Sequence, residues 1–324
     1  MIKYLMALMF MFGFSLNSYA YWSCAWPYRT AVSVQENTGT TLTDYQVQIT
    51  ITGSDLNAAY DWTSNGFDLR VVDSDDVTLL DFWVDSWDQA GETATVWVKF
   101  DALTASQNRQ LYIYYGNEFA DQLANVPFTF VEPGIKFHTR RVLTNPSSLA
   151  QAQSLFDSVA DDNTGYGCTF IDDFTGIENS DEFGSNRNFI AYSETYFKVE
   201  TGEDGVWGVR YGADFGGGGG LYVDGFALEE QWSDDLWWDN DWDLSNEVLE
   251  GTIDLDEGFH KLEVIGQEGG NDGGITVQFQ RPGGSFISYD VNDIEIVSRA
   301  CPVSNEPTVT FGAQATATCP SALA

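Results

Sequence analysis

The stretch Thr95-Val96-Trp97-Val98-Lys99-Phe100 decides the fold class, because valine and phenylalanine recur in it at every second position. A period of two places alternate side chains on opposite faces of a β-strand. The same alternation occurs in four further segments, at residues 31–34, 45–51, 67–71 and 110–115. Turn residues separate the segments, without helical periodicity between them. Short strands at this spacing predict a β-sandwich over residues 21–125.

A second β-rich half follows in the chain. Strand-like alternation returns after Gly165 among many glycines, and we predict a second β-rich domain over residues 146–300. The fold class is therefore all-β, with two β-sandwich or jelly-roll-like domains. The glycines at 216–220 lack the Lys-Ser or Lys-Thr of a phosphate-binding loop, so a flexible hairpin loop is expected there. Residues 301–324 are predicted to be a cysteine-containing tail.

The two halves are predicted to be joined by a connector with one short helix. Residues 126–145 contain Pro127 and Pro133-Gly134, which are typical of a linker. Ser147 or Ser148 is suited to cap a helix that runs to Val159. One face of this helix would be apolar, since it carries Leu149, Ala152, Leu155, Phe156 and Val159.

Residues 1–20 have the order of a secretory signal peptide. Lys3 precedes an apolar run from Tyr4 to Phe14, and the small residues Ser18 and Ala20 end the segment. The run is shorter than the ~20 apolar residues that a membrane span needs, which favours a cleaved peptide over an N-terminal anchor. We therefore expect an exported protein that acts in the periplasm, at the cell surface or in the medium.

The chain is strongly acidic. Its 324 residues include 49 Asp and Glu but only 14 Lys and Arg, and the formal net charge is −35. Such a charge disfavours nucleic acids and anionic membranes as partners. A hydrophobic fraction of 43% and an aromatic fraction of 15% argue against intrinsic disorder. The composition is that of a folded, acidic protein.

Four cysteines remain for disulfide formation, namely Cys24, Cys168, Cys301 and Cys319. An even number in an oxidising compartment favours two disulfides over free thiols or a metal site. Three pairings are possible, and the sequence leaves them open. The pairing of Cys301 with Cys319 closes a local loop and is slightly preferred, which leaves Cys24 to pair with Cys168.

Residues 234–243, here called the acid–tryptophan loop, contain five carboxylates and three indoles. Adjacent carboxylates repel one another unless a cation neutralises them or water solvates them freely. Calcium prefers six to eight oxygen ligands, and alternating aspartates can wrap around one ion. The candidate calcium ligands of the loop are Asp234, Asp235, Asp239, Asp241 and Asp243. The alternative is a solvated acidic surface; an EF-hand is disfavoured because Leu244 stands where that loop needs glycine.

Four tryptophans in and beside this loop are candidate ligand-binding residues, namely Trp232, Trp237, Trp238 and Trp242. An exposed indole can stack on the C–H face of a sugar ring. The alternative is that these side chains pack into the core, where tryptophan is usually found largely buried.

Part of the first half resembles a known family. The segments Trp26-Pro27-Tyr28-Arg29, Phe67-Asp68-Leu69-Arg70-Val71-Val72-Asp73 and Tyr112-Ile113-Tyr114-Tyr115-Gly116-Asn117 occur in the order and spacing of the domain-of-unknown-function family 2341. The resemblance covers about residues 22–120. It implies a β-sandwich accessory module of exported and envelope proteins, with no catalytic residues to transfer.

Part of the second half is similar to the protective-antigen-like β-barrel domain. The similarity covers about residues 195–290 and includes the hairpin Leu221-Tyr222-Val223-Asp224-Gly225 and the strand Gly258-Phe259-His260-Lys261-Leu262-Glu263-Val264. It implies glycan binding through calcium held by two adjacent aspartates before the hairpin. Here Asp214 is followed by Phe215, so the second aspartate is absent. Asp214 and Asp224 complete the candidate calcium ligands.

The leading functional hypothesis is a secreted, non-catalytic recognition protein that binds a glycan or cell-surface polymer with the help of calcium. The alternative is a structural component of the envelope or an appendage that acts through contacts with other exported proteins. A glycoside hydrolase is a third hypothesis, since 49 acids allow many carboxylate pairs. Catalytic signatures give it little support, because the chain lacks a Gly-x-Ser-x-Gly elbow and a His-Glu-x-x-His pair.

Overall fold

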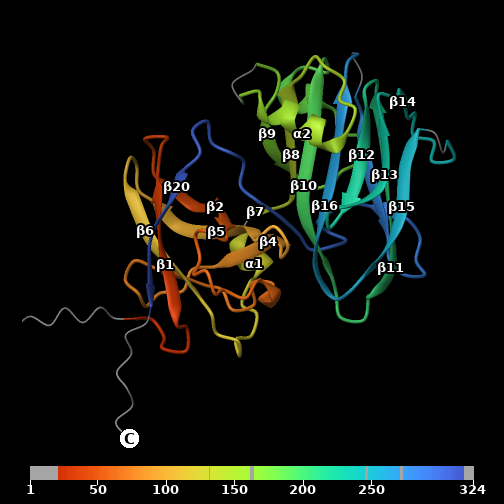
Figure 1. Cartoon of the computed structure of the whole chain (residues 1–324). Coiled ribbons are helices and arrows are strands. Elements are labelled where there is room, and N and C mark those ends of the chain that lie inside the picture. Colours follow the sequence, from red (N-terminus) through yellow and green to blue (C-terminus); the bar gives the residue numbers. More distant parts are fainter. Residues whose placement is uncertain (1–20, 131, 161–163, 245–246, 271–272, 317–324) are drawn as a thin grey trace, which may run out of the picture.

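The computed structural model describes residues 21–130, 132–160, 164–244, 247–270 and 273–316, and its architecture is all-β. Two β-sandwich units lie beside each other (Figure 1). The predicted signal peptide, residues 1–20, and Cys319 lie outside the described residues. In the described part of the chain, no helix is long and apolar enough to cross a membrane.

The first sandwich contains seven strands and a 3-10 turn. Their bounds are β1 (Tyr28–Gln35), β2 (Leu42–Thr52), η1 (Trp62–Ser64), β3 (Arg70–Asp73), β4 (Phe82–Asp88), β5 (Thr93–Leu103), β6 (Asn108–Tyr115) and β20 (Thr308–Thr316). One sheet has the order β20-β1-β6-β3 and the other the order β2-β5-β4. Val96, Val98 and Phe100 of β5 are fully buried in the core between them, as the alternation predicts.

α1 (Val126–Thr129) follows the first sandwich and packs against its strands β4 and β5. The second unit contains the elements β7 (Glu132–Pro133), β8 (Ile135–Arg141), α2 (Leu149–Asp157), β9 (Cys168–Ile171), α3 (Asn179–Phe183), β10 (Phe189–Val199), β11 (Gly205–Phe215), β12 (Gly218–Val223), β13 (Phe226–Trp232), β14 (Leu236–Trp237), β15 (Val248–Leu255), β16 (Gly258–Glu268), β17 (Ile275–Gln280), β18 (Ile287–Ser288) and β19 (Ile296–Ser298).

These strands form an eight-stranded and a five-stranded sheet. The first has the order β13-β12-β16-β10-β19-β7, with β8 paired to β10 and β9 paired to β8; the second has the order β14-β11-β17-β18, with β15 paired to β11. The core between the sheets includes Trp207, Tyr211 and Phe279, each 2% exposed or less. The two sheets therefore pack against each other around a shared core, which is the pattern of a sandwich.

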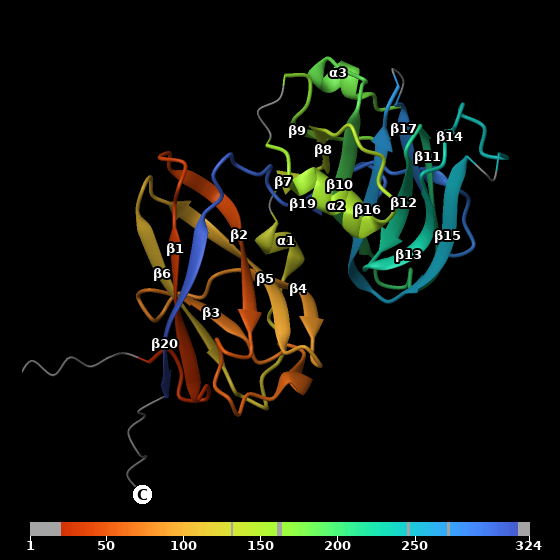
Figure 2. The ribbon, with the colours of Figure 1, turned by 45° about the horizontal axis from the view of Figure 1, so that its top comes forward.

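The helix prediction is confirmed near its expected bounds. α2 begins after Ser148, whose side chain accepts a hydrogen bond from the backbone N–H of Gln151 at 3.2 Å. Ala152 and Phe156 are buried against the eight-stranded sheet, and Figure 2 shows α2 lying across that sheet near β16. The shorter helices α1 and α3 were not anticipated.

The structure corrects the predicted linker and the predicted tail. Residues 135–141 of the expected linker form β8, which pairs with β10 over four residues. In the expected tail, β20 pairs with β1 of the first sandwich from Tyr28 to Gln35 (Figure 1). The chain thus leaves the first sandwich after β6, builds the second unit and returns to complete the first sheet.

The structure also corrects the preferred disulfides. Cys168 is bonded to Cys301, so the pairings Cys301–Cys319 and Cys24–Cys168 are wrong. Cys24 is disulfide-bonded as well. The bonded pair is 133 residues apart in sequence, because the eight-stranded sheet brings β9 close to the segment that follows β19. A preference for short loops could not find this pairing.

The glycine run is another correction. Gly218, Gly219 and Gly220 begin the buried strand β12 and do not form a flexible loop. An ideal Cβ on Gly219 would lie 2.7 Å from the backbone oxygen of Ile265 on the paired strand β16. The glycines therefore allow close approach of neighbouring backbones in the sheet.

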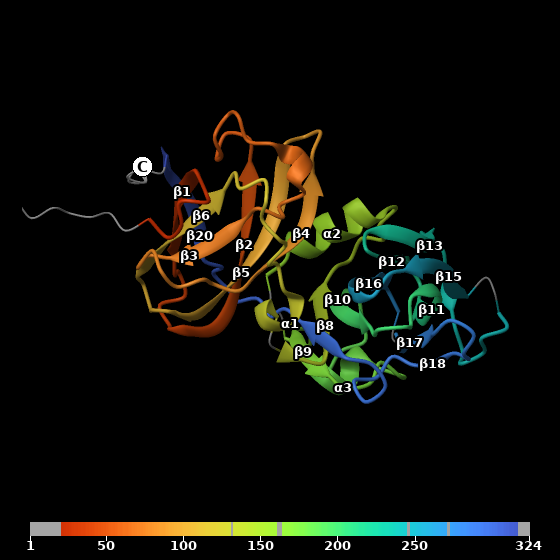
Figure 3. The ribbon, with the colours of Figure 1, turned by 90° about the horizontal axis from the view of Figure 1, so that it is seen from below.

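The two units share a small apolar cluster and several polar contacts. The rings of Phe130 and Tyr196 stack with centroids 4.7 Å apart, and Trp97 of β5 packs beside them. The hydroxyl of Tyr196 donates to Asp85 Oδ1 at 2.7 Å, and Lys261 Nζ lies 3.5 Å from the same oxygen. Figure 3 shows β4 and β5 on the side of the first sandwich that faces the second unit.

Candidate functional site

The acid–tryptophan loop lies at the outer edge of the second unit, around β14 (Figure 1). Its carboxylates are exposed, as expected for either a metal loop or a solvated surface. Asp234 Oδ1 accepts from the backbone N–H of Asp235 at 3.0 Å, and Asp241 Oδ1 accepts from that of Asp243 at 3.0 Å. Asp239 is also exposed.

The structure does not gather these aspartates around one point. Among the residues that the structure describes, no three His, Cys, Asp or Glu side chains lie close enough to hold a metal ion. Asp214 is half-buried on β11, opposite Trp237 in the β-ladder. Calcium binding by the seven candidate ligands therefore stays a prediction.

Asp224 has a structural partner in His260. Its Oδ2 lies 2.7 Å from His260 Nδ1, and the backbone oxygen of Asp256 lies 2.8 Å from His260 Nε2. Both partners are acceptors, so the geometry favours protons on both ring nitrogens. Burial lowers the pKa of His260, but the hydrogen bonds to Asp224 and Asp256 outweigh it and raise the pKa overall. Asp224 is thus paired with the side chain of His260.

The four candidate tryptophans have different environments. Trp238 is 6% exposed and lies directly over Gly212, where an ideal Cβ would be 2.4 Å from two indole carbons. Trp242 packs against Trp238 with ring centroids 4.7 Å apart, and the Arg210 guanidinium lies 4.0 Å from its ring centroid. These two side chains anchor the loop onto the outer face of β11.

The other two tryptophans are more accessible. Trp232 is half-buried, and its Nε1 donates to Glu230 Oε1 at 3.0 Å. Trp237 is 70% exposed. Of the four, Trp237 presents the largest fraction of its ring to solvent, so it remains the best candidate of this group for ligand stacking.

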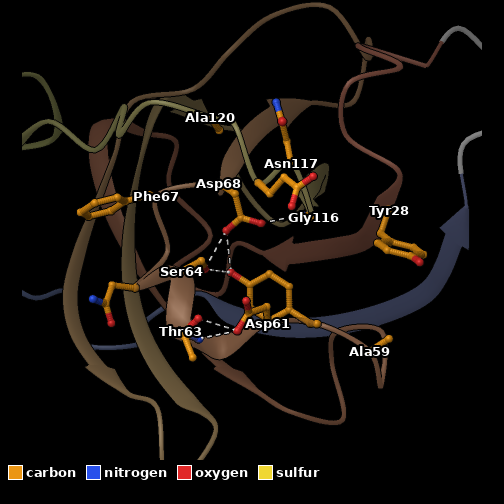
Figure 4. Close-up of a pocket in the computed structure, with 13 residues that line it drawn as sticks. Tyr28, Ala59, Asp61, Thr63, Ser64, Phe67, Asp68, Gly116, Asn117 and Ala120 are labelled. Carbon is orange, nitrogen blue, oxygen red and sulfur yellow. Dashed lines mark hydrogen bonds between the residues drawn. The ribbon is translucent and has the colours of Figure 1, made fainter.

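A second candidate site, which the sequence did not suggest, is a pocket of about 450 Å³ in the first sandwich. Its walls are formed by residues of the segment 59–68, by Tyr28 at the start of β1, and by Gly116, Asn117, Glu118 and Ala120 of the loop that follows β6 (Figure 4). The alternation at 67–71 predicted a strand, but β3 begins only at Arg70. Phe67 and Asp68 instead lie in the preceding turn and line the pocket.

Asp68 joins the two walls of this pocket. It is 5% exposed, and its Oδ1 accepts from the Tyr60 hydroxyl at 2.7 Å and from Ser64 Oγ at 3.0 Å. Its Oδ2 accepts from the backbone N–H of Gly116 at 2.6 Å. Three hydrogen bonds to one buried carboxylate fix the separation of the walls, so the pocket is formed before any ligand arrives.

Local backbone features support the same geometry. Asp61 caps η1, because its Oδ1 accepts from Thr63 N at 2.9 Å and from Thr63 Oγ1 at 2.7 Å. These hydrogen bonds lower the pKa of Asp61, which is therefore ionised at neutral pH. Gly116 has a φ of +92°, and an ideal Cβ there would lie 2.9 Å from the Tyr28 ring. Glycine is thus required where the loop passes the ring.

The pocket combines aromatic rings with hydrogen-bonding groups. Figure 4 shows Phe67 and Tyr28 on opposite sides, with Asp68 between them. The Phe67 side chain is 47% exposed. Asn117 and Glu118 contribute an amide and a carboxylate from the loop after β6. Such a lining can hold a ligand that has both an apolar face and hydroxyl groups.

One signal for this pocket was present in the sequence. Asn65-Gly66 is a turn dipeptide, and Asn65 does adopt a left-handed conformation with φ of 50°. The contact between Asp68 and Gly116, however, joins residues 48 apart in sequence. Neither residue by itself indicates a pocket.

Comparison with solved structures gives distant similarities. The PA14 domain of the MpAFP antifreeze protein is 14% identical with a TM-score of 0.40, and the match covers 52% of this chain and 93% of that one. A PA14 sugar-binding domain from an RTX adhesin is 13% identical with a TM-score of 0.36, covering 52% of this chain and all of that one. An anti-sigma factor domain-containing protein is 10% identical with a TM-score of 0.36, covering 83% and 79%.

Among curated proteins, none matches this chain. The family resemblance of the first half is confirmed in part of its range: residues 65–133 match the family model described as a domain of unknown function, DUF2341.

Proposed function

We propose that this protein is an exported, non-catalytic recognition protein that binds a glycan or cell-surface polymer through the pocket of the first sandwich. One observation carries the proposal. Tyr28 and Phe67 lie on opposite sides of a preformed pocket whose remaining lining includes carboxylates and amides. Sugar rings have C–H faces that suit aromatic rings and hydroxyls that suit carboxylate and amide oxygens.

The size and rigidity of the pocket support the same proposal. Ligand pockets typically enclose roughly 300–1,000 Å³, and a pocket of about 450 Å³ has room for a short saccharide segment. Because Asp68 holds the two walls together, little conformational entropy would be lost when the ligand binds. Preorganisation of this kind increases affinity without additional contacts.

Calcium binding by the acid–tryptophan loop is a separate part of this proposal. The exposed carboxylates of the acid–tryptophan loop are available to a divalent cation, and Trp237 lies among them. Calorimetric titration of the mature chain with calcium tests this part separately. Calcium uptake that disappears when Asp239, Asp241 and Asp243 are replaced by asparagine would support a calcium-dependent loop.

The glycan proposal is tested with a glycan array, probed with the mature chain in calcium and in chelator. Phe67→Ala removes an exposed ring, so the fold should be retained while the affinity falls at least tenfold, equivalent to about 1.4 kcal/mol. Phe119→Ala is the matched control, because Phe119 is 86% exposed and does not line the pocket.

Two results would contradict the proposal. One is the absence of any glycan signal, which together with capture of an envelope protein would favour the structural alternative. The other is unchanged glycan binding by the Phe67→Ala variant, which would move the binding site elsewhere on the molecule. Retained circular dichroism of the variant establishes that the comparison is made on folded protein.

A further inference from the structure

A separate pocket of about 310 Å³ lies where the two units meet. Trp97 of β5 lines it from the first sandwich, and Lys136 of β8 and Glu194 of β10 line it from the second unit. Arg299, which follows β19, and Glu306, which precedes β20, also line the pocket. The pocket therefore exists only when both units are in place.

The charge of this lining differs from that of the whole protein. The chain has 14 Lys and Arg against 49 Asp and Glu, whereas this pocket is lined by three cations, Lys136, Arg140 and Arg299, and by three carboxylates, Asp157, Glu194 and Glu306. Arg140 has other partners, since its Nη1 donates to the backbone oxygen of Phe156 at 3.0 Å. Lys136 and Arg299 are the cations that face the pocket without such backbone acceptors among the described residues.

Several hydrogen-bond donors of the pocket are unsatisfied. Trp97 Nε1 and Arg299 Nε are both buried and have no acceptor among the residues that the structure describes. The Arg299 guanidinium lies 4.6 Å from the centroid of the Trp97 ring, so the two donors are held close together. Native proteins rarely leave buried N–H groups without an acceptor.

Lys136 adds a third poorly satisfied donor. Its side chain is 5% exposed, and its Nζ lies 3.8 Å from Glu194 Oε1, which is an ion pair but longer than a hydrogen bond. Burial lowers the pKa of Lys136 to about 8, and the nearby Arg299 charge acts in the same direction. A negative group in the pocket would relieve both effects.

The acceptors of the pocket are already engaged. Both carboxylate oxygens of Glu306 accept from the Tyr45 hydroxyl, at 2.8 and 2.9 Å. Glu194 and Asp157 form ion pairs with Lys136 and Arg140, each at 3.8 Å. Trp97 Nε1, Arg299 Nε and Lys136 Nζ are therefore the donors that lack a hydrogen-bonded acceptor among the described residues, and a partner that supplies oxygen lone pairs in a small volume would satisfy them.

We propose that this interdomain pocket binds a compact oxyanion, in the form of a carboxylate, sulfate or phosphate group, held by Arg299, Lys136 and Trp97 Nε1. The site is separate from the pocket of the first sandwich, whose lining has carboxylates but no Lys or Arg side chain. Because both units contribute donors, the bound anion stabilises their relative arrangement.

The test is a set of thermal melts and calorimetric titrations of the full mature chain. The probes are sodium sulfate, sodium phosphate and sodium glucuronate at constant ionic strength, with glucose as the uncharged control. We expect a saturable rise in melting temperature, since a ligand that binds only the folded state stabilises it. Binding of glucuronate alone identifies an acidic sugar as the source of the anion, whereas binding of sulfate and phosphate identifies free inorganic ions.

Two variants assign the binding to this pocket. Arg299→Gln should weaken binding at least tenfold, and Trp97→Phe, which keeps the ring but removes the Nε1 donor, should weaken it several-fold. Arg141→Gln is the matched control, because Arg141 is exposed at the end of β8 and lies outside the lining. Phe67→Ala should leave anion binding unchanged, which separates this proposal from the glycan proposal.

The proposal is overturned if none of the three anions binds. Water would then be the hydrogen-bond acceptor for these donors. It is equally overturned if anion binding persists at full affinity in both folded pocket variants. The second variant keeps the test decisive should the Arg299→Gln protein fail to fold.

Discussion

The pocket of the first sandwich and the acid–tryptophan loop of the second unit contain similar side chains, namely aromatic rings beside carboxylates. In the pocket, the buried carboxylate of Asp68 accepts from three donors and joins the two walls. In the loop, the carboxylates are exposed and two of the rings, Trp238 and Trp242, hold the loop against β11. Density of functional side chains along the chain is therefore a poor guide to where a cavity forms.

The largest expected effect concerns Asp68. Asp68→Ala should lower the free energy of unfolding by about 3 kcal/mol, because it leaves the donors of Tyr60, Ser64 and Gly116 without their acceptor. Urea denaturation measures the change. Glu118→Ala is the control, since Glu118 is exposed on the same pocket and should shift stability by less than about 0.5 kcal/mol. Equal effects of the two changes would show that Asp68 does not hold the walls.

The next effect concerns the anchoring of the acid–tryptophan loop. Gly212→Ala places a methyl group where the Trp238 indole lies, and the overpacking should cost about 2 kcal/mol. A red shift of tryptophan fluorescence should accompany the loss. In Gly216→Ala the new methyl group meets only Asp235 Oδ1, at 3.7 Å, so this variant should be close to neutral. A stable Gly212→Ala protein with unchanged fluorescence would contradict the anchoring role of Trp238.

A smaller effect is the pH dependence from His260. The pKa of His260 is raised in the folded state, so its contribution to stability is present below the ordinary pKa of about 6.5 and is lost as the pH rises through the folded value. Urea denaturation from about pH 5 to about pH 9 should show this loss in the wild type and not in His260→Gln.

The same pH series, repeated with calcium, tests whether Asp224 is a calcium ligand. If calcium is bound by Asp224, it must compete with the imidazolium for that carboxylate, and calcium on the order of millimolar should flatten the pH dependence. An unchanged pH profile in calcium would remove Asp224 from the candidate ligands. A His260→Gln protein that keeps the wild-type slope would show that another group titrates.

The smallest expected effect on stability is that of Trp237. Trp237→Phe should change the free energy of unfolding by less than about 0.5 kcal/mol, since the side chain is 70% exposed. The variant should lose the fraction of fluorescence that acrylamide quenches most readily. The same substitution at Trp238, which is 6% exposed, should leave that fraction intact. If the Trp238 variant loses the readily quenched fraction and the Trp237 variant keeps it, Trp238 and not Trp237 is the exposed ring in solution.

Much of the fold was predictable because alternation reports burial directly. Val96, Val98 and Phe100 were assigned to one face of a strand, and all three are fully buried. Ser148 was a candidate cap and does cap α2. The strand predicted at 67–71 was wrong at its start, because Phe67 and Asp68 lie in a turn although the sequence alternates there. Local pattern and local structure disagreed at the place where the pocket is built.

The candidate site was less predictable. Whether Trp237 or Trp238 is exposed depends on Gly212, which lies on a strand more than twenty positions earlier and leaves room for one indole. The alternating aspartates invited a metal loop, but their spacing along the chain does not determine whether their oxygens converge. The oxyanion pocket needs residues from both units, and neither half of the sequence contains it alone.

The sequence by itself determined that this protein is all-β, acidic and rich in half-buried strands, because side-chain alternation and charge are properties of neighbouring residues. The tertiary structure alone decided that residues 308–316 complete the first sheet, that Cys168 pairs with Cys301, and that Asp68 meets Gly116. Each of these contacts joins distant parts of the chain. Their formation depends on the free energy of packing whole sheets together, which no local pattern records.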